Sequence, residues 1–271
     1  MEKATFQLVL TGDTADQHEF QGYDGYMALA GFAWALSLIT NYVETAEIRQ
    51  RREFAGRSAV RAGLLEEGSL IANFSVWLEK LPKDVFGPNA DGSSAHLLYE
   101  LVKRVIDRNL GSAGNANDTQ VNAILDRRSG DIETLVAISE APLRQAHSVI
   151  GNGAKKVKIV GGHRIIRTFD EGTRDYMKLN YEDPTLKKIV TSVSSFNGNS
   201  GHGSVFDTSL GKNVPFSMSR DTLRKYGSVF SWGLHQYITK TGKKVEIEFS
   251  RILAMDETPK RYVISNAEVK Q

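Results

Sequence analysis

The chain has 271 residues, of which 41% are hydrophobic and 24% charged, with a net charge of +2 and no cysteine. This composition is that of a soluble globular protein, and the length suits one large domain or two modest ones. The absence of cysteine excludes disulfide scaffolds, cysteine-ligated zinc, iron–sulfur clusters and thiol nucleophiles, and it fits a reducing compartment such as the cytoplasm.

The first elements predicted are a strand and a long apolar helix. Phe6, Leu8 and Leu10 recur at every second position of a predicted strand over 4–11. A helix is predicted over 23–45, with Asp24 placed to cap its start. The helix is apolar nearly all round and is almost long enough to span a membrane, but its polar residues favour the centre of a soluble domain. The residues before it lack the pattern of a signal peptide.

The middle of the chain alternates strand-like and helix-like segments. We expect hairpins over 57–65 with 69–78 and over 157–160 with 163–169. We also expect one helix that starts at Ser93 or Ser94, and three short helices over 118–128, 129–138 and 139–150. The last of these helices opens with Ser-Glu-Ala-Pro, which is a helix start signal. The predicted N-terminal domain is therefore of the α+β class, with a mixed sheet packed on the long buried helix and several shorter helices.

The last third of the chain predicts three strands, a helix and two more strands. The strands cover 189–196, 203–208, 213–217, 244–254 and 261–265, and the helix follows Ser219 as its N-cap. This order is typical of the five-stranded OB-like β-barrel, which commonly binds oligonucleotides or oligosaccharides. We place the domains at 1–185 and 186–271, because Pro184 discourages a helix across the boundary.

Charge separates the two predicted domains. Residues 186–271 hold 13 Lys and Arg against 7 Asp and Glu, a net charge of +6, whereas the other 185 residues hold 21 against 25, a net charge of −4. A basic barrel favours an anionic partner. We expect phosphate contacts from basic side chains and base stacking from aromatic ones, so the candidate ligand-binding residues are His202, Phe206, Lys212, Phe216, Arg251, Lys260 and Arg261.

Each of these features has a structural interpretation as well. Both phenylalanines could fill the barrel interior, and the basic residues could form a solvated rim. The glycine-rich run 197–203 could cradle a phosphate, but it has neither the Gly-Lys-Ser/Thr of a phosphate-binding loop nor a following helix, so a hairpin turn is the better interpretation.

An acidic loop offers a different chemistry. Asp13, Asp16, His18, Glu19 and Asp24 crowd the segment between the first strand and the long helix, where they could bind a metal or act as acid and base. No familiar spacing such as His-Glu-x-x-His is present, so a solvated capping loop is favoured.

Four short motifs carry a resemblance to a known family: Leu-Val-Leu-Thr-Gly-Asp-Thr-Ala-Asp-Gln-His at 8–18, Tyr-Asp-Gly at 23–25, Ile-Thr-Asn-Tyr at 39–42 and Glu-Gly-Ser at 67–69. With them the chain resembles an uncharacterised family of bacterial and phage proteins, in which an N-terminal α+β domain precedes a small C-terminal β-barrel. The resemblance implies a prokaryotic or phage origin and a role in phage–host conflict. It implies no catalytic residues.

The sequence thus predicts a cytoplasmic, non-enzymatic protein that binds a nucleic acid or a nucleotide-type anion. It predicts no cofactor, no metal and no membrane association. One alternative is a protein–protein interaction module, such as an inhibitor or a subunit of a defence complex, which would have a protein partner or form a homo-oligomer. The weaker alternative is a metal-dependent hydrolase centred on the acidic loop.

Overall fold

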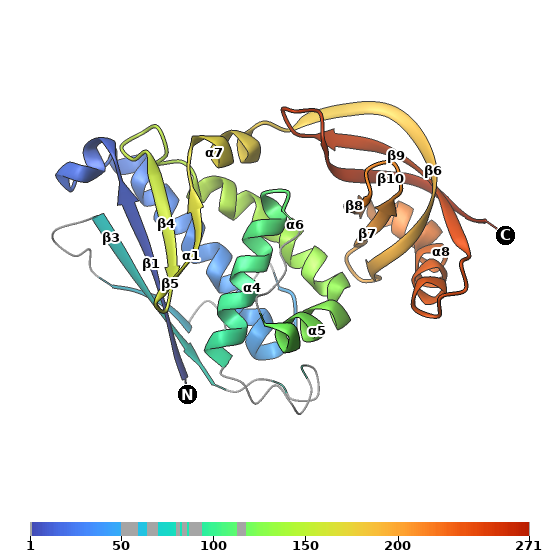
Figure 1. Cartoon of the computed structure of the whole chain (residues 1–271), viewed down its shortest axis with the longest axis horizontal. Coiled ribbons are helices and arrows are strands. Elements are labelled where there is room, and N and C mark those ends of the chain that lie inside the picture. The colour runs from blue at the N-terminus through green and yellow to red at the C-terminus, as the bar shows by residue number, and fades with distance from the viewer. Residues whose placement is uncertain are drawn as a thin grey trace. The chain divides into compact units, whose positions relative to one another are not determined.

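A computed structural model describes most of the chain. The described residues are 2–49, 59–63, 70–79, 82, 86, 94–112 and 118–270. They form two compact units (Figure 1). Unit 1 comprises Met1–Arg127 and Ile138–Lys178, and unit 2 comprises Arg128–Ala137 and Leu179–Gln271. The predicted division after residue 185 falls inside a strand of unit 2 and stays a prediction.

Unit 1 contains a five-stranded sheet in which every strand pair is antiparallel, rather than the mixed sheet that the sequence led us to expect. Its strands are β1 (Glu2–Thr11), β2 (Val60–Ala62), β3 (Leu70–Leu78), β4 (Lys156–Gly161) and β5 (Arg164–Phe169), in the spatial order β2-β3-β1-β4-β5. The first strand is therefore central, and it pairs with β3 on one side and β4 on the other. The turn of the hairpin expected over 57–65 and 69–78 lies outside the described residues, as does the Glu-Gly-Ser motif.

Helices α1 (Gly22–Thr45) and α4 (Ser94–Asn109) pack on one face of this sheet (Figure 1). The other helices of the described residues are η1 (Asp13–Gln17), α5 (Thr119–Arg127), α6 (Ser129–Ala146) and α7 (Glu171–Lys178), of which α6 places its first half in unit 2. The buried ring of Phe32 on α1 lies 6.3 Å from Phe6 of β1 and 5.3 Å from Phe74 of β3. By length and composition α1 could cross a membrane, but most of its apolar window is buried in the fold, as in the core helix of a soluble protein.

Two expectations about helix ends are wrong. The N-cap of α1 is Gln21, without a side-chain hydrogen bond, and Asp24 lies in the first turn, where its charge still suits the helix dipole. The helices expected over 129–138 and 139–150 form one continuous helix, α6, with Pro142 inside it. A Cβ atom on Gly31 would approach the Pro142 carbonyl oxygen to 2.6 Å, so α1 and α6 touch closely here. The helix therefore continues through Pro142, although the Ser-Glu-Ala-Pro sequence there is a helix start signal.

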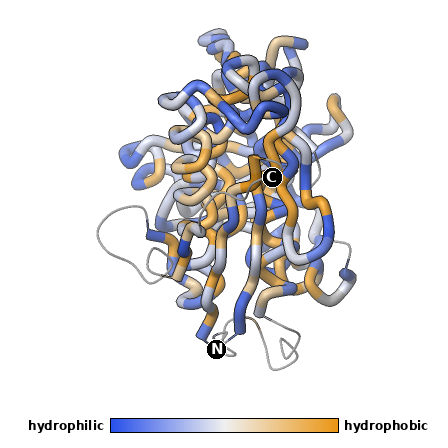
Figure 2. The backbone as a smooth tube through the Cα atoms, turned by 90° about the vertical axis from the view of Figure 1, so that its left-hand side faces the viewer, coloured by the Kyte–Doolittle hydropathy of each residue, from blue (hydrophilic) through white to orange (hydrophobic). Residues whose placement is uncertain are grey.

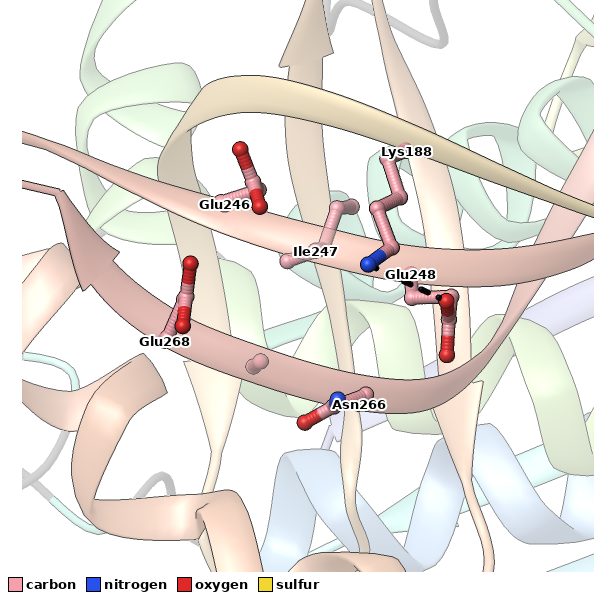
Figure 3. Close-up of a pocket in the computed structure, with 7 residues that line it drawn as sticks. Lys188, Glu246, Ile247, Glu248, Asn266 and Glu268 are labelled. Atoms are coloured by element: carbon pink, nitrogen blue, oxygen red, sulfur yellow. Dashed lines mark ion pairs between the residues drawn. The ribbon is translucent and has the colours of Figure 1, made fainter.

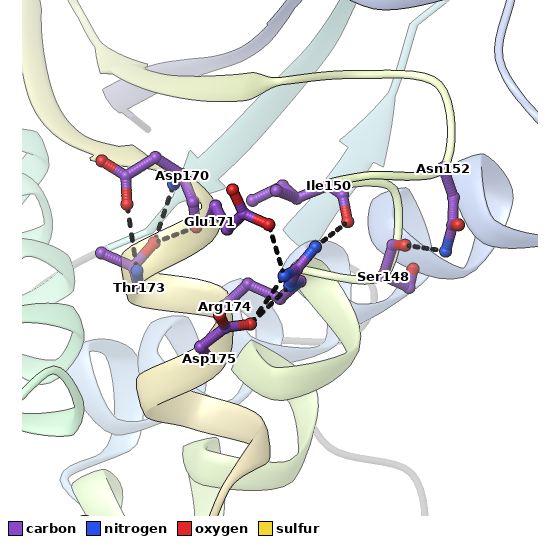
Figure 4. Close-up of polar contacts among 8 residues, drawn as sticks. All are labelled: Ser148, Ile150, Asn152, Asp170, Glu171, Thr173, Arg174 and Asp175. Atoms are coloured by element: carbon purple, nitrogen blue, oxygen red, sulfur yellow. Dashed lines mark hydrogen bonds and ion pairs between the residues drawn. The ribbon is translucent and has the colours of Figure 1, made fainter. Parts of the chain in front are cut away.

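A network around Arg174 fastens α7 to the end of α6 (Figure 4). The Asp170 side chain accepts a hydrogen bond from the Thr173 backbone N–H at 3.0 Å, which caps α7. The Arg174 guanidinium donates to the Ile150 carbonyl at 3.2 Å and to carboxylates of Glu171 and Asp175 at 3.0 and 2.8 Å. These bonds hold the turn after α6 in place, and their geometry identifies this cluster as structural.

Unit 2 is a closed five-stranded barrel. Its elements are β6 (Tyr181–Asn197), β7 (His202–Asp207), β8 (Lys212–Met218), α8 (Arg220–Ile238), β9 (Lys244–Leu253) and β10 (Pro259–Lys270). The strands close in the order β10-β8-β7-β6-β9, with β8 and β10 parallel and the other neighbours antiparallel. The prediction of an α+β protein that ends in an OB-like barrel is therefore confirmed, including the helix between the third and fourth barrel strands.

The barrel interior is apolar and is covered by α8. Val205, Val214 and Phe216 are buried in the core, and Phe230 of α8 packs on them. The Ser219 hydroxyl accepts a hydrogen bond from the Thr222 N–H at 3.1 Å, so the predicted cap of α8 is confirmed.

Candidate nucleic-acid interface

The outer surface of β7 and β8 is the part of the barrel where the sequence predicts a ligand. Side chains alternate along these strands, and the register pairs outward residues with one another. We call this surface the β7–β8 face. It consists of His202, Phe206, Asn213, Pro215 and Ser217, whereas Ser204, which lies opposite Pro215, is buried.

Phe206 and Phe216 lie on opposite sides of the barrel wall. Phe206 is 39% exposed and lies opposite Asn213 of β8 and Ser192 of β6. Phe216 is 1% exposed and its ring centroid lies 4.9 Å from that of Phe230. The expectation that Phe216 stacks on a ligand is therefore wrong, because its position in β8 has the same parity as the buried Val214. Phe206 keeps its candidate role.

Three predicted basic residues are engaged within the chain. The Arg251 guanidinium forms an ion pair with Asp183, and Nε of Arg251 donates to the same carboxylate oxygen at 3.0 Å. The hydrogen bond from Arg251 lowers the pKa of Asp183 to about 2. The Lys260 ammonium donates to the Asn180 side chain at 2.6 Å, and Arg261 also has interactions with the chain. Lys212 is exposed at the start of β8, beside Asp256.

Burial lowers the pKa of His202, and the nearby positive charge of Arg261 lowers it further, so both favour the neutral imidazole. Its Nδ1 atom is buried and has no hydrogen-bond partner among the described residues. His202 and Arg261 are thus close enough to interact, and a neutral imidazole would offer a hydrogen bond rather than a charge to a phosphate.

The loop between β6 and β7 is tied to the first half of α6, which belongs to the same unit. The Asn197 amide donates to the Asp131 carboxylate at 2.8 Å, and the hydroxyls of Ser200 and Thr134 lie 2.7 Å apart. A Cβ atom on Gly130 would come within 2.6 Å of the Phe196 carbonyl oxygen, so the helix backbone touches the loop. The glycine-rich run is a hairpin turn, as expected, and its conformation is fixed by α6.

Three glutamates of the barrel gather away from the β7–β8 face. Glu246, Glu248 and Glu268 line a pocket on β9 and β10, together with Lys188 of β6 (Figure 3). Glu246 lies directly opposite Glu268, and Lys270 bridges them at 3.0 and 3.5 Å. The hydrogen bond from Lys270 lowers the pKa of Glu246. Negative charge therefore gathers on this side, which we call the acidic face, and this face does not suit an anionic ligand.

The acidic loop of unit 1 has a structural role. The Asp16 carboxylate accepts a hydrogen bond from the Gly12 N–H at 2.7 Å, and the Ala15 N–H donates to the Gly153 carbonyl at 2.8 Å. Within the described part of the chain, no group of three His, Asp or Glu residues is arranged to hold a metal ion. The geometry therefore lends no support to the hydrolase alternative.

Serine side chains on the barrel wall were not anticipated. The Ser194 and Ser195 hydroxyls lie 2.9 and 2.7 Å from the hydroxyl of Ser204 across the β6–β7 pair, where the register of β6 shifts. Alternation with the buried Val205 would have placed Ser204 on the outside, but Ser204 is buried as well. The bulge in β6 that brings two consecutive serines to one partner left no signal in the sequence.

These features define an α+β protein with an OB-like barrel. A family described as a domain of unknown function, DUF7946, matches residues 6–178, and the chain belongs to this family. The matched segment ends where unit 1 ends. No curated protein and no solved structure matches the chain.

Proposed function

We propose that this protein binds a nucleic acid or a nucleotide-type anion without catalysing a reaction, and that the β7–β8 face of the barrel is a binding surface. The distribution of acidic groups is the observation that carries the proposal. Asp207 is the single acidic residue in β7 and β8, and its carboxylate is buried against the Tyr262 hydroxyl at 2.5 Å. The β7–β8 face itself presents no carboxylate, whereas three glutamates gather on the acidic face.

The chemistry of the β7–β8 face suits a single strand. The half-exposed Phe206 ring can stack on a base, since base–aromatic stacking accepts every base and contributes about 1–3 kcal/mol. Lys212 and Arg261 supply positive charge for phosphates. The neighbouring side chains of Asn213 and Ser217 are hydrogen-bond donors and acceptors of the kind that contact sugars and base edges. Within this proposal, the resemblance to bacterial and phage proteins suggests a role in the conflict between them.

Fluorescence anisotropy of labelled 20-residue oligothymidine and oligouridine tests this surface. We expect Phe206→Ala to weaken binding at least fivefold, which is about 1 kcal/mol of stacking free energy. Lys212→Glu should weaken binding and flatten its salt dependence. Lys188→Glu is the matched control, because it makes the same change of charge on the acidic face and should leave affinity unchanged. Equal effects of all three variants would contradict the assignment.

A second candidate function, protein–protein interaction, is favoured by the edge of β6. Residues 181–191 of this strand pair with β9 along one edge, while pairing with β7 begins only at Ser192, so the other edge carries no strand of the described residues. Tyr181 and Leu186 on this segment are 69% and 57% exposed. An open edge can accept a strand of a partner protein. Co-purification of one defined partner that no longer binds the Leu186→Lys variant would support this function.

A further inference from the structure

The sheet of unit 1 has one face that no described helix covers. The buried side chains of β1 and β3 point toward α1 and α4, as the contacts of Phe6 with Phe32 and Tyr99 show. The alternate residues point away. Figure 2 views unit 1 from the side on which the sheet lies, and hydrophilic and hydrophobic residues alternate along its strands.

The register places these outward residues in rows across the strands. We call their surface the open sheet face. Its rows are Trp77–Lys3, Arg61–Ser75–Thr5, Asn73–Gln7–Val160–Ile165, Ile71–Val9–Lys158–Thr168 and Thr11–Lys156. The Gln7 amide donates to the Asn73 side chain at 2.9 Å, so the middle of the face is polar and ordered.

Every charge on the open sheet face is positive. Lys3, Arg61, Lys156 and Lys158 lie on it, and none of them forms an ion pair with a described residue. Glu2 is the only acidic residue in the five strands, and its carboxylate accepts a hydrogen bond from the Ala95 N–H of α4 on the covered side. Residues 1–185 carry a net charge of −4, so this surface is basic within an acidic part of the chain.

An aromatic ring stands at one end of the open sheet face. The Lys3 ammonium lies 5.4 Å from the centroid of the Trp77 ring, and the Arg61 guanidinium carbon lies 5.9 Å from it. Both cations are held beside the indole by cation–π attraction. The side chain of Trp77 is partly exposed, so an aromatic surface and two positive charges are presented together.

We propose that the open sheet face is a binding surface for single-stranded nucleic acid. Val9 lies six positions after Lys3 on β1 and opposite Lys158. The two basic ends of the face are therefore about 20 Å apart at about 3.4 Å per residue. A strand of several nucleotides can run along β1 between them. Trp77 supplies a stacking platform, and the amides and hydroxyls between the ends can contact sugars and bases. This assignment is independent of the barrel, because a different set of residues carries it.

The test uses the full-length chain and the labelled oligothymidine and oligouridine. The double variant Lys156→Glu/Lys158→Glu should bind at least tenfold more weakly. The slope of log affinity against log salt should become shallower by about 1.4, because each phosphate that a lysine no longer neutralises reduces it by about 0.7. Trp77→Ala should weaken binding at least fivefold, while Trp77→Phe keeps a ring and recovers most of the affinity. The control Lys240→Glu/Lys243→Glu changes two exposed lysines between α8 and β9 and should leave affinity within about twofold of the wild type.

The outcomes separate the two binding surfaces. If the lysine double variant binds as the wild type does while Phe206→Ala weakens binding, the open sheet face is not a site and the barrel proposal stands. If only the sheet variants weaken binding, the sheet assignment holds and the barrel proposal fails. Wild-type protein that binds phosphatidylserine vesicles but neither oligonucleotide would overturn the sheet assignment in favour of a membrane surface. Circular dichroism of each variant identifies loss of folding. If Trp77→Ala unfolds, the double variant Lys156→Glu/Lys158→Glu still tests the assignment, because Lys156 is exposed and Lys158 is partly exposed.

Discussion

His147 makes the stability of unit 1 depend on pH. Its side chain is fully buried and stacks on Phe169 with ring centroids 3.9 Å apart, and Nδ1 lies 2.7 Å from the Leu143 carbonyl oxygen. Burial lowers its pKa from 6.5 to about 4, against the opposing effects of the Leu143 hydrogen bond and the Asp170 charge. The folded state therefore takes up a proton on His147 only near pH 4, whereas the unfolded state takes it up below about pH 6.5.

The magnitude follows from linkage. The stability that the neutral His147 contributes is fully present above pH 6.5 and is lost as pH falls, by about 1.4 kcal/mol per pH unit. The loss amounts to about 3 kcal/mol near pH 4. Urea unfolding followed by tryptophan fluorescence in a Trp232→Phe background reports unit 1 through Trp34 and Trp77.

The His147→Phe variant keeps a ring against Phe169 and cannot titrate. Its free energy of unfolding should fall less steeply than that of the parent between pH 6.5 and 4.5. Over this range the variant should lose about 2–3 kcal/mol less than the parent. Comparing slopes removes the constant effect of the substitution and the titration of carboxyl groups common to both proteins. Parallel pH profiles would refute the reasoning.

Three further substitutions test the packing of the barrel. Tyr262→Phe removes the hydroxyl that donates to the buried Asp207 carboxylate and should lower the free energy of unfolding of unit 2 by about 2 kcal/mol, measured by urea unfolding. Gly203→Ala places a Cβ atom 2.3 Å from the Ser195 carbonyl oxygen, so it should cost about 1–3 kcal/mol and lower the melting temperature, whereas an unchanged melting temperature would contradict that geometry. Ser219→Ala removes the α8 cap and should cost about 1 kcal/mol, with Ser219→Asp retaining the stability.

The barrel was predictable because its strands and helix carry strong local signals. Runs of alternating or β-branched residues end at Gly, Asn or Ser, and Ser219 marks the start of α8. The extent of β6 was not predictable. Its exposed first half, from Tyr181 to Val190, joins the sheet by pairing with β9, which lies more than 50 residues further along the chain. Backbone pairing of this kind leaves little pattern in the sequence.

The candidate site was predictable only in part. Phe216 alternates with Pro215 and Ser217 and shares the parity of Val214, so its burial could have been inferred from the strand pattern. The engagement of Arg251 could not, because its partner Asp183 is 68 residues away and the register between their strands is set by the closed barrel. For the same reason the sequence did not reveal that Trp77 and Lys3, on strands far apart in the chain, share one open surface.

The most direct test of the central claim is the salt dependence of oligonucleotide binding by the full-length protein. Our account predicts that affinity for a labelled 20-residue oligothymidine or oligouridine falls between about 50 and 200 mM salt along a straight line in log affinity against log salt, with a slope steeper than about −2, as expected when three or more phosphates are neutralised. Undetectable binding at the low-salt end, or an affinity unchanged across this range, would contradict it.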